Sequence, residues 1–156
     1  MNLPLDREGL SVELGFASIQ INPMYAQNSR GKFELLALQA LGQATLDVRR
    51  ISWDLSLFCS EEFSFVRLPK SLCTGSSIMP NKSNPDLVEL LRTLHSDVVG
   101  AQLELDSVLS LPSGYHRDLQ STKGSFLRPW GRAIAGLKLV AKLIAALDFE
   151  QTRMLR

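Results

Sequence analysis

The stretch that decides the fold runs from Asp86 to Ser110 and reads DLVELLRTLHSDVVGAQLELDSVLS. Its apolar side chains recur at alternating steps of four and three, which is the heptad spacing of long packed helices. Asn84 suits the N-cap and Pro85 suits the first turn, while Asp86 and Glu89 place negative charge at the positive end of the helix dipole. We therefore predict one long packed helix with the seam residues Leu87, Leu91, Leu94, Val98, Ala101, Leu105 and Val108.

Two further long helices are predicted on either side of this segment. From Gly31 to Cys59 the apolar residues lie on two neighbouring stripes, so we expect this helix to be buried on several sides. The third pattern runs from Lys123 to Phe149, and Pro129 is expected to open or kink it near its start. A shorter helix is expected over Asp6 to Leu14. The sequence predicts an all-α protein of long antiparallel helices, whose apolar surface needs other helices or neighbouring subunits as partners.

Composition excludes several classes of protein. The chain has 156 residues, enough for about one domain, and its net charge of +1 gives no electrostatic case for binding nucleic acid. No apolar stretch approaches the ~20 residues of a membrane span, and Asp6, Arg7 and Glu8 stand where a signal peptide would be apolar. Cys59 and Cys73 lack metal-ligand spacing, so no metal site is predicted. We expect them to be reduced thiols of a cytoplasmic protein.

The link between the first two long helices contains residues that suit chemistry on an anion. From Thr74 to Pro85 it reads TGSSIMPNKSNP, with hydroxyls beside a glycine, a lysine at position 82 and a helix start. Backbone N–H groups at a helix start attract carboxylates, and Lys82 adds a positive charge at the same end. A substrate with carboxylates fits this segment. The alternative is a polar loop whose serines bond only to backbone groups.

This stretch resembles the signature loop G-S-S-x-M-P-x-K-x-N-P of the fumarase/aspartase superfamily, and all of its fixed residues are present from Gly75 to Pro85. The resemblance implies an all-α homotetramer that releases fumarate or a close analogue by β-elimination. It also implies that Ser76 removes the proton next to a carboxylate, its alkoxide stabilised by Lys82 and loop amides. Asn84 would bind substrate. Glu89 would pair with a catalytic histidine elsewhere, or serve only as a helix-start carboxylate.

The second link, Leu111 to Lys123, reads LPSGYHRDLQSTK and resembles the segment L-P-x-x-Y-N-x-D-L-Q-x-x-K of the argininosuccinate lyase family. The resemblance implies that Tyr115, Gln120 and Lys123 contact argininosuccinate, which is split into arginine and fumarate without a metal or organic cofactor. His116 stands where asparagine is usual. The sequence NSRGK at residues 28–32 replaces an acidic S-D-R-D pattern of that family. His95, inside the heptad helix, is interpreted as structural or exposed.

The resemblance covers almost the whole chain but only the central region of the family. A general-acid histidine in a T-H-x-Q segment, an upstream substrate-binding loop and the first bundle helices are not found. We therefore expect residues 1–156 to form a single partial domain of the central bundle, with the signature loop at about 60–85. Its active sites would be shared between subunits, and the chain alone would be inactive. The alternatives are a non-catalytic helical oligomerisation module, as in lens crystallins, or another fumarate-releasing lyase such as adenylosuccinate lyase.

Overall fold

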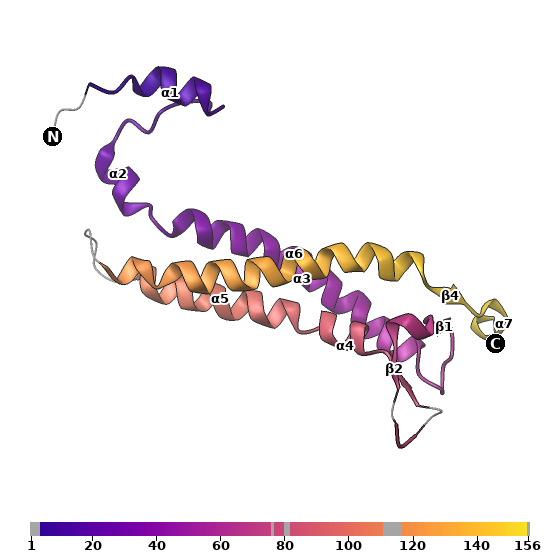
Figure 1. The fold of residues 1–156 in the computed structure, drawn as a ribbon. Coiled ribbons are helices and arrows are strands. Elements are labelled where there is room, and N and C mark those ends of the chain that lie inside the picture. The colour runs from indigo at the N-terminus through magenta and orange to yellow at the C-terminus, as the bar shows by residue number, and fades with distance from the viewer. Residues whose placement is uncertain (1–3, 76, 80–81, 111–116, 156) are drawn as a thin grey trace.

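The computed structural model describes residues 4–75, 77–79, 82–110 and 117–155. Three long helices lie side by side along most of their lengths: α3 (Lys32–Phe58), α5 (Leu94–Leu109) and α6 (Thr122–Ala145). The chain runs along α3, returns through α4 (Asp86–Leu91) and α5, and runs out again along α6, so neighbouring helices are antiparallel (Figure 1). The predicted all-α class is confirmed.

Helix α3 matches the predicted range to within one residue at each end. It starts after Gly31, whose φ of 83° is left-handed, and a Cβ at that position would lie 2.6 Å from the Cδ2 of Leu109. Within the chain, α3 is covered on one face. That face comprises Leu38, Leu41, Gly42, Thr45, Val48, Ser52 and Leu55. The neighbouring stripe stays open, since Phe33 is 62% exposed and Leu36 is 63% exposed. The expected burial on several sides is therefore not met inside this chain.

The heptad segment is interrupted where a single helix was predicted. α4 ends at Leu91 and α5 starts at Leu94, although Arg92 and Thr93 keep helical dihedral angles. The hydroxyl of Thr93 donates to the carbonyl of Leu90 at 2.7 Å, and the Thr93 amide donates to the same carbonyl at 3.0 Å. These i to i−3 bonds tighten the turn and break the regular ladder. The seam is confirmed at Leu91, Leu94, Val98, Ala101 and Leu105, which are all buried.

The predicted N-cap of this segment was wrong by one residue. Pro85, with φ −79° and ψ 54°, occupies the cap position of α4, and its carbonyl accepts the amide of Glu89 at 3.0 Å. Asn84 belongs to a short strand instead, because its backbone pairs with Thr74. Asp86 and Glu89 do lie in the first turn of α4, as the charge pattern predicted.

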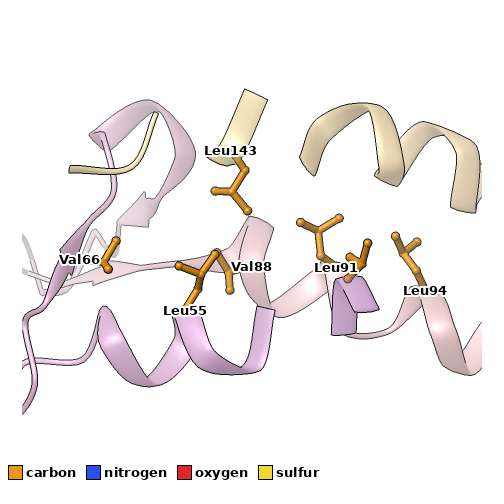
Figure 2. Packing of buried hydrophobic residues seen from close by; sticks show 7 residues of the cluster. Leu55, Val66, Val88, Leu91, Leu94 and Leu143 are labelled. Atoms are coloured by element: carbon orange, nitrogen blue, oxygen red, sulfur yellow. The ribbon is translucent and has the colours of Figure 1, made fainter. Parts of the chain in front are cut away.

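The core consists of two apolar clusters that follow each other along the bundle. One contains Leu38, Leu41, Val98, Ala101, Leu105 and Ala133. The other lies towards the opposite end and contains Val48, Leu55, Val66, Val88, Leu91, Leu94 and Leu143. Figure 2 shows Leu143 of α6 pointing towards Leu55 of α3 and Val88 of α4, so three helices meet there. Each cluster therefore joins α3 and α6 to the α4–α5 segment.

Helix α6 packs on α5 through small side chains. The residues buried along this line are Thr122, Ser125, Pro129, Ala133 and Gly136. The predicted apolar stripe of Phe126, Trp130, Ile134 and Leu137 lies beside this line and packs against the core at its edge. Pro129 lies inside the helix and does not open it. The helix ends at Ala145, short of the predicted Phe149.

The remaining elements are short. α1 (Arg7–Glu13) confirms the predicted helix after Asp6, whereas α2 (Pro23–Asn28) was not predicted. β1 (Val66–Arg67) pairs antiparallel with β4 (Asp148–Phe149), and β2 (Thr74–Gly75) pairs antiparallel with β3 (Ser83–Asn84). The others are the 3₁₀ turns η1 (Lys70–Leu72) and η2 (Arg117–Gln120) and the helix α7 (Gln151–Met154). None of the described helices has the length and apolarity needed to cross a bilayer.

Candidate active site

The candidate signature loop is closed at its base by a β-hairpin. Thr74 pairs with Asn84, and Gly75 pairs with Ser83, so the two ends of the loop are held side by side. The hydroxyl of Thr74 also donates a hydrogen bond to the carboxylate of Asp86, the first residue of α4. Figure 1 shows the hairpin projecting from the end of the bundle beside α4. The hairpin therefore carries the loop directly onto the N-terminus of α4.

Some of the predicted residues of this loop lie in the described part of the chain and others do not. Lys82 is exposed, and its amide donates to the carbonyl of Met79 at 3.0 Å. Asn84 is half-buried in β3. Ser76, the predicted base, lies outside the described residues. Its neighbours on the hairpin, Gly75 and Ser77, are exposed, so the described part of the loop faces solvent.

Glu89 lines an open groove between α3 and the α4–α5 segment. The groove has a volume of about 650 Å³ and is lined by Leu46, Arg49, Arg50, Trp53, Asp54, Glu89, Arg92, Thr93 and Ser96. The guanidinium of Arg92 lies 5.6 Å from the centroid of the Trp53 ring, and Arg49 donates to the hydroxyl of Ser96 at 3.4 Å. Glu89 is exposed where it lines this groove.

The second predicted group lies where η2 joins α6. Gln120 is the last residue of η2, and Lys123 lies in the first turn of α6. The junction is held by Asp118, whose carbonyl accepts the Ser121 amide at 3.0 Å and the Ser121 hydroxyl at 2.7 Å. Gln120 and Lys123 are both exposed. Tyr115, the third predicted residue, lies outside the described residues, as does His116.

The chain does not bring these two groups together. The signature hairpin precedes α4, and the Gln120–Lys123 corner follows α5, at the opposite end of the bundle (Figure 1). Asp86 and Leu109 bound the helical path between them, which covers roughly 35 Å at ~1.5 Å per residue. One molecule of this chain therefore cannot present both groups to one small substrate.

His95 has a structural position, in agreement with its interpretation from sequence. Its Nδ1 lies 3.2 Å from the carbonyl oxygen of Gly42 and 3.4 Å from the hydroxyl oxygen of Thr45. Gln102 makes a parallel contact, since its amide donates to the carbonyl of Leu38 at 2.8 Å. These contacts join α5 to α3, two of them through backbone carbonyls of α3. Nothing in this position brings His95 near either predicted group.

Sequence reasoning missed two residues near the candidate site. Asp86 was interpreted as a helix-dipole charge, yet it also binds Thr74 across the hairpin. Arg30 was given no role from the sequence, yet it lines a pocket together with Lys123. In each case the two residues lie in different elements and far apart in the chain. The polarity of each residue was visible in the sequence, but its partner was not.

Cys59 is the one described group whose pKa is clearly shifted. Burial at the end of α3 raises the pKa of the Cys59 thiol, and the nearby Cys73 thiolate raises it further. Both cysteines are free thiols in the structure. A raised pKa keeps Cys59 neutral and unreactive at physiological pH, so it is no candidate nucleophile.

Comparison with known proteins places the chain in a family. A family model described as lyase matches residues 4–100, which include the hairpin and α4, and the chain belongs to this lyase family. The argininosuccinate lyases of Stenotrophomonas maltophilia and Xanthomonas campestris pv. campestris are 59% and 58% identical to it over 154 residues. Each alignment covers 99% of this chain and 36% of the relative. The chain thus spans about a third of the length of these relatives.

Solved structures share the fold at lower identity. A crystal structure described as fumarate lyase:delta crystallin from Brucella melitensis, bound to cobalt, superposes with a TM-score of 0.69 at 24% identity. It matches 92% of this chain and 32% of its own. EDDS lyase in complex with formate gives a TM-score of 0.65 at 22% identity, covering 99% of this chain and 30% of its own. The antiparallel helix arrangement is therefore that of fumarate lyase bundles.

Proposed function

We propose that this chain contributes to an argininosuccinate lyase, which splits argininosuccinate into arginine and fumarate. The observation that carries the proposal is the 59% identity to an enzyme of that name over 154 residues. The structure supports it, because a paired hairpin holds the signature loop at the start of α4. Enzyme class and substrate are proposed for the complete assembly, of which this chain spans part.

The proposed reaction is a β-elimination. Ser76, as an alkoxide, takes the proton from the carbon beside a carboxylate, and the electron pair moves to form the double bond of fumarate as the C–N bond breaks. Lys82 and loop amides stabilise the alkoxide, because positive charge lowers the pKa of a neighbouring hydroxyl. Asn84 binds the substrate, and Glu89 orients a histidine from another part of the assembly, which protonates the leaving nitrogen. This chemistry requires neither a metal nor an organic cofactor.

The assembly we propose is a cytoplasmic homotetramer with active sites shared between subunits. The separation of the two predicted groups supports sharing, since each end of the bundle presents a different part of a site. Exposed apolar side chains on all three long helices support further packing. One subunit would supply the signature loop with Ser76, and another would supply Tyr115, Gln120 and Lys123.

A mixing experiment tests the proposed function. The chain is combined with the Stenotrophomonas enzyme in which the serine aligned with Ser76 is replaced by alanine, and fumarate release is followed by ultraviolet absorbance. We expect no turnover from either component alone and turnover of argininosuccinate from the mixture. Adenylosuccinate serves as the competing substrate, and faster turnover of it would reassign the specificity.

The mixture also tests the alternative of a non-catalytic oligomerisation module. Co-assembly on a sizing column without fumarate release, under conditions where wild-type subunits regain activity after remixing, would support the module and contradict the lyase proposal. The Ser76→Ala chain is the matched control. It should co-assemble equally well and restore nothing.

A further inference from the structure

Charge is segregated between two neighbouring helices of the bundle. Helix α5 contains neither lysine nor arginine, and its acidic residues are Asp97, Glu104 and Asp106. Helix α6 contains no acidic residue, and its basic residues are Lys123, Arg128, Arg132, Lys138 and Lys142. Helix α3, by contrast, carries equal numbers of acidic and basic residues. The outer surface that α5 and α6 share is therefore acidic along one helix and basic along the other.

Only part of this charge is neutralised within the chain. The Nη1 atom of Arg132 lies 3.0 Å from the Oδ2 atom of Asp97, so these two residues form an ion pair between the helices. Asp106 of α5 and Arg128 of α6 are both exposed, and neither forms an ion pair with the part of the chain that the structure describes. Each helix thus keeps charge of one sign on its solvent side.

The space between the two helices is open to another helix. A groove of about 490 Å³ runs between α5 and α6 and is lined by residues of both. A Cβ added at Gly100 of α5 or at Gly131 of α6 would meet nothing within 4 Å, so both backbones can be approached closely. Val99 and Leu103 of α5 and Leu127 of α6 are exposed. The two helices therefore offer apolar contact as well as charge.

The register of the two helices brings the exposed charges to the same height along the bundle. The hydroxyl of Ser125 on α6 donates to the carboxylate of Glu104 on α5, which fixes one height. At ~1.5 Å per residue, Asp106 lies about 3 Å from this height on one side and Arg128 about 4.5 Å on the other. Helical side chains lean towards the N-terminus of their own helix. Because the helices are antiparallel, Asp106 and Arg128 both lean towards the height of the Glu104–Ser125 contact.

We propose that the outer surface of α5 and α6 is where a second copy of this chain docks, with its own α5 and α6. A two-fold axis parallel to the helices sets α5 of each copy against α6 of the other, and the four helices form a bundle. Asp106 of one copy then faces Arg128 of the other, twice by symmetry. Docking of α5 on α5, or of α6 on α6, sets like charges against each other. The inference rests on the self-association in the proposed function and names the surface and charges that direct it.

The arrangement of charge favours a second copy over an anionic surface. A membrane of anionic lipids is attracted by α6 but repelled by α5, which lies directly beside it. A second copy pairs the charges of both helices. The net charge of +1 also leaves little repulsion between whole chains.

A charge swap between the two helices tests this pairing. Asp106→Lys and Arg128→Glu each set like charges against each other at both symmetric contacts. Each variant alone should therefore self-associate with a Kd raised roughly tenfold or more in sedimentation velocity. An equimolar mixture of the two variants has opposite charges at both contacts, so its Kd should return to within about threefold of that of the unaltered chain. Raised salt should shrink these differences, because it screens exposed charges.

Asp47→Lys is the matched control, because Asp47 is an exposed carboxylate of α3 and the substitution changes the net charge equally. It should associate as the unaltered chain does, and circular dichroism should show folded helices in every variant. The double variant Asp106→Lys/Arg128→Glu should also associate normally, which keeps the test decisive if one single variant folds poorly.

Several results overturn the surface. These are no association of the unaltered chain, an equal loss in Asp47→Lys, or no recovery in both the mixture and the double variant. Tighter association of Asp106→Lys with the unaltered chain than of the unaltered chain with itself would indicate α5 on α5. Binding of monomers to vesicles of phosphatidylserine and phosphatidylcholine, lost in Arg128→Glu, would assign α6 to a lipid surface instead.

The two proposals fail separately, because sedimentation does not depend on catalysis. Fumarate release in the mixing experiment, together with association that ignores Asp106 and Arg128, removes this surface and leaves the lyase. Association that follows the charge swap, without fumarate release, keeps the surface and removes the lyase.

Discussion

Gly136 sets how closely α6 approaches the α4–α5 segment. A Cβ at this position would lie 2.2 Å from the Cδ1 atom and 3.3 Å from the Cγ atom of Leu94. Leu94 is 7% exposed and belongs to the core, so its side chain has little freedom to move away. Because Gly136 has no side chain, α6 can pack directly against Leu94 and complete the core there.

We predict that Gly136→Ala destabilises the fold by about 1–3 kcal/mol, because overpacking of a core forces neighbouring side chains out of place. Gly131→Ala is the control on the same helix, since a Cβ there meets nothing within 4 Å. That substitution should stabilise the helix by about 0.5–1 kcal/mol. Urea unfolding followed by circular dichroism measures both. Equal effects of the two substitutions would contradict the close packing.

The raised pKa of Cys59 predicts that the stability of the fold depends on pH. Burial and then the Cys73 thiolate raise its pKa in the folded chain, so unfolding releases a thiol that ionises more easily. The stability that this thiol contributes is complete below the unfolded pKa, near 8.5, and is lost as the pH rises through the folded value. Above about pH 8.5 the free energy of unfolding should therefore fall more steeply for the unaltered chain than for Cys59→Ala. Parallel pH profiles in denaturant melts would refute the assignment.

Residue-scale prediction from sequence worked where a repeating pattern carried the signal. The heptad spacing identified Leu91, Leu94, Val98, Ala101 and Leu105, and all are buried. It did not identify Val88, which is 0% exposed and lies one turn before the seam residue Leu91. Among the candidate site residues, Lys82, Asn84, Glu89, Gln120 and Lys123 were identified from the sequence. The structure then shows where each of them lies. Their chemical roles rest on the proposed function.

At the scale of elements, the hairpin and α4 act as one unit. β2 and β3 pair through Thr74 and Asn84, and Thr74 is bonded to Asp86 at the start of α4. The base of the hairpin is therefore tied to the first turn of α4. Neither Thr74 nor Asp86, the two residues of this hydrogen bond, has a proposed role in the chemistry.

Thr74→Val removes the hydroxyl and keeps the shape of the side chain, so it tests this link directly. We expect a loss of about 1 kcal/mol in stability, because a hydrogen bond to a carboxylate is replaced by an apolar group. We also expect faster amide hydrogen exchange at Gly75 and Ser83. Asp86→Asn retains an acceptor oxygen and should have a smaller effect. Unchanged exchange in Thr74→Val would mean that strand pairing alone holds the hairpin.

Elements with strong periodicity were predictable, and elements held by distant partners were not. α3 and the start of α6 follow from their apolar stripes to within one residue. β1 was missed because its partner β4 lies at the other end of the chain, and the salt bridge of 2.9 Å between Arg67 and Glu150 supports that pairing. The sequence does contain the capping signal that starts α2, but no helix was predicted there. Asn22 caps it by accepting the amides of Met24 and Tyr25, and Pro23 opens it.

At the scale of the whole molecule, a large part of the apolar surface is uncovered. Leu103 of α5 is 68% exposed and Val99, one turn before it, is 44% exposed. Phe33 and Leu36 of α3 are open as well. Soluble proteins rarely leave contiguous apolar faces of this kind bare, so they mark surfaces for association. The expectation that the helices need further partners is consistent with this surface.

We predict that the combined substitution Val99→Glu and Leu103→Glu shifts the chain towards monomers in sedimentation velocity, since two charges would have to be buried in the interface. Arg153→Glu is the control, because it changes the net charge by the same amount in the short helix α7. Circular dichroism should show folded helices in both variants. If both variants sediment as the unaltered chain does, α5 takes no part in association.

The central claim is that the two ends of one chain serve different active sites, and a swap of defects measures it most directly. A Lys123→Gln chain keeps the signature loop and loses the corner, whereas the Stenotrophomonas enzyme lacking its signature serine keeps the corner and loses the base. Mixed together, they should release fumarate from argininosuccinate at a substantial fraction of the rate that the unaltered chain restores. A Ser76→Ala chain in the same mixture should restore nothing. If Lys123→Gln abolishes recovery as completely as Ser76→Ala does, loop and corner must act within one subunit, and the account of a shared site is wrong.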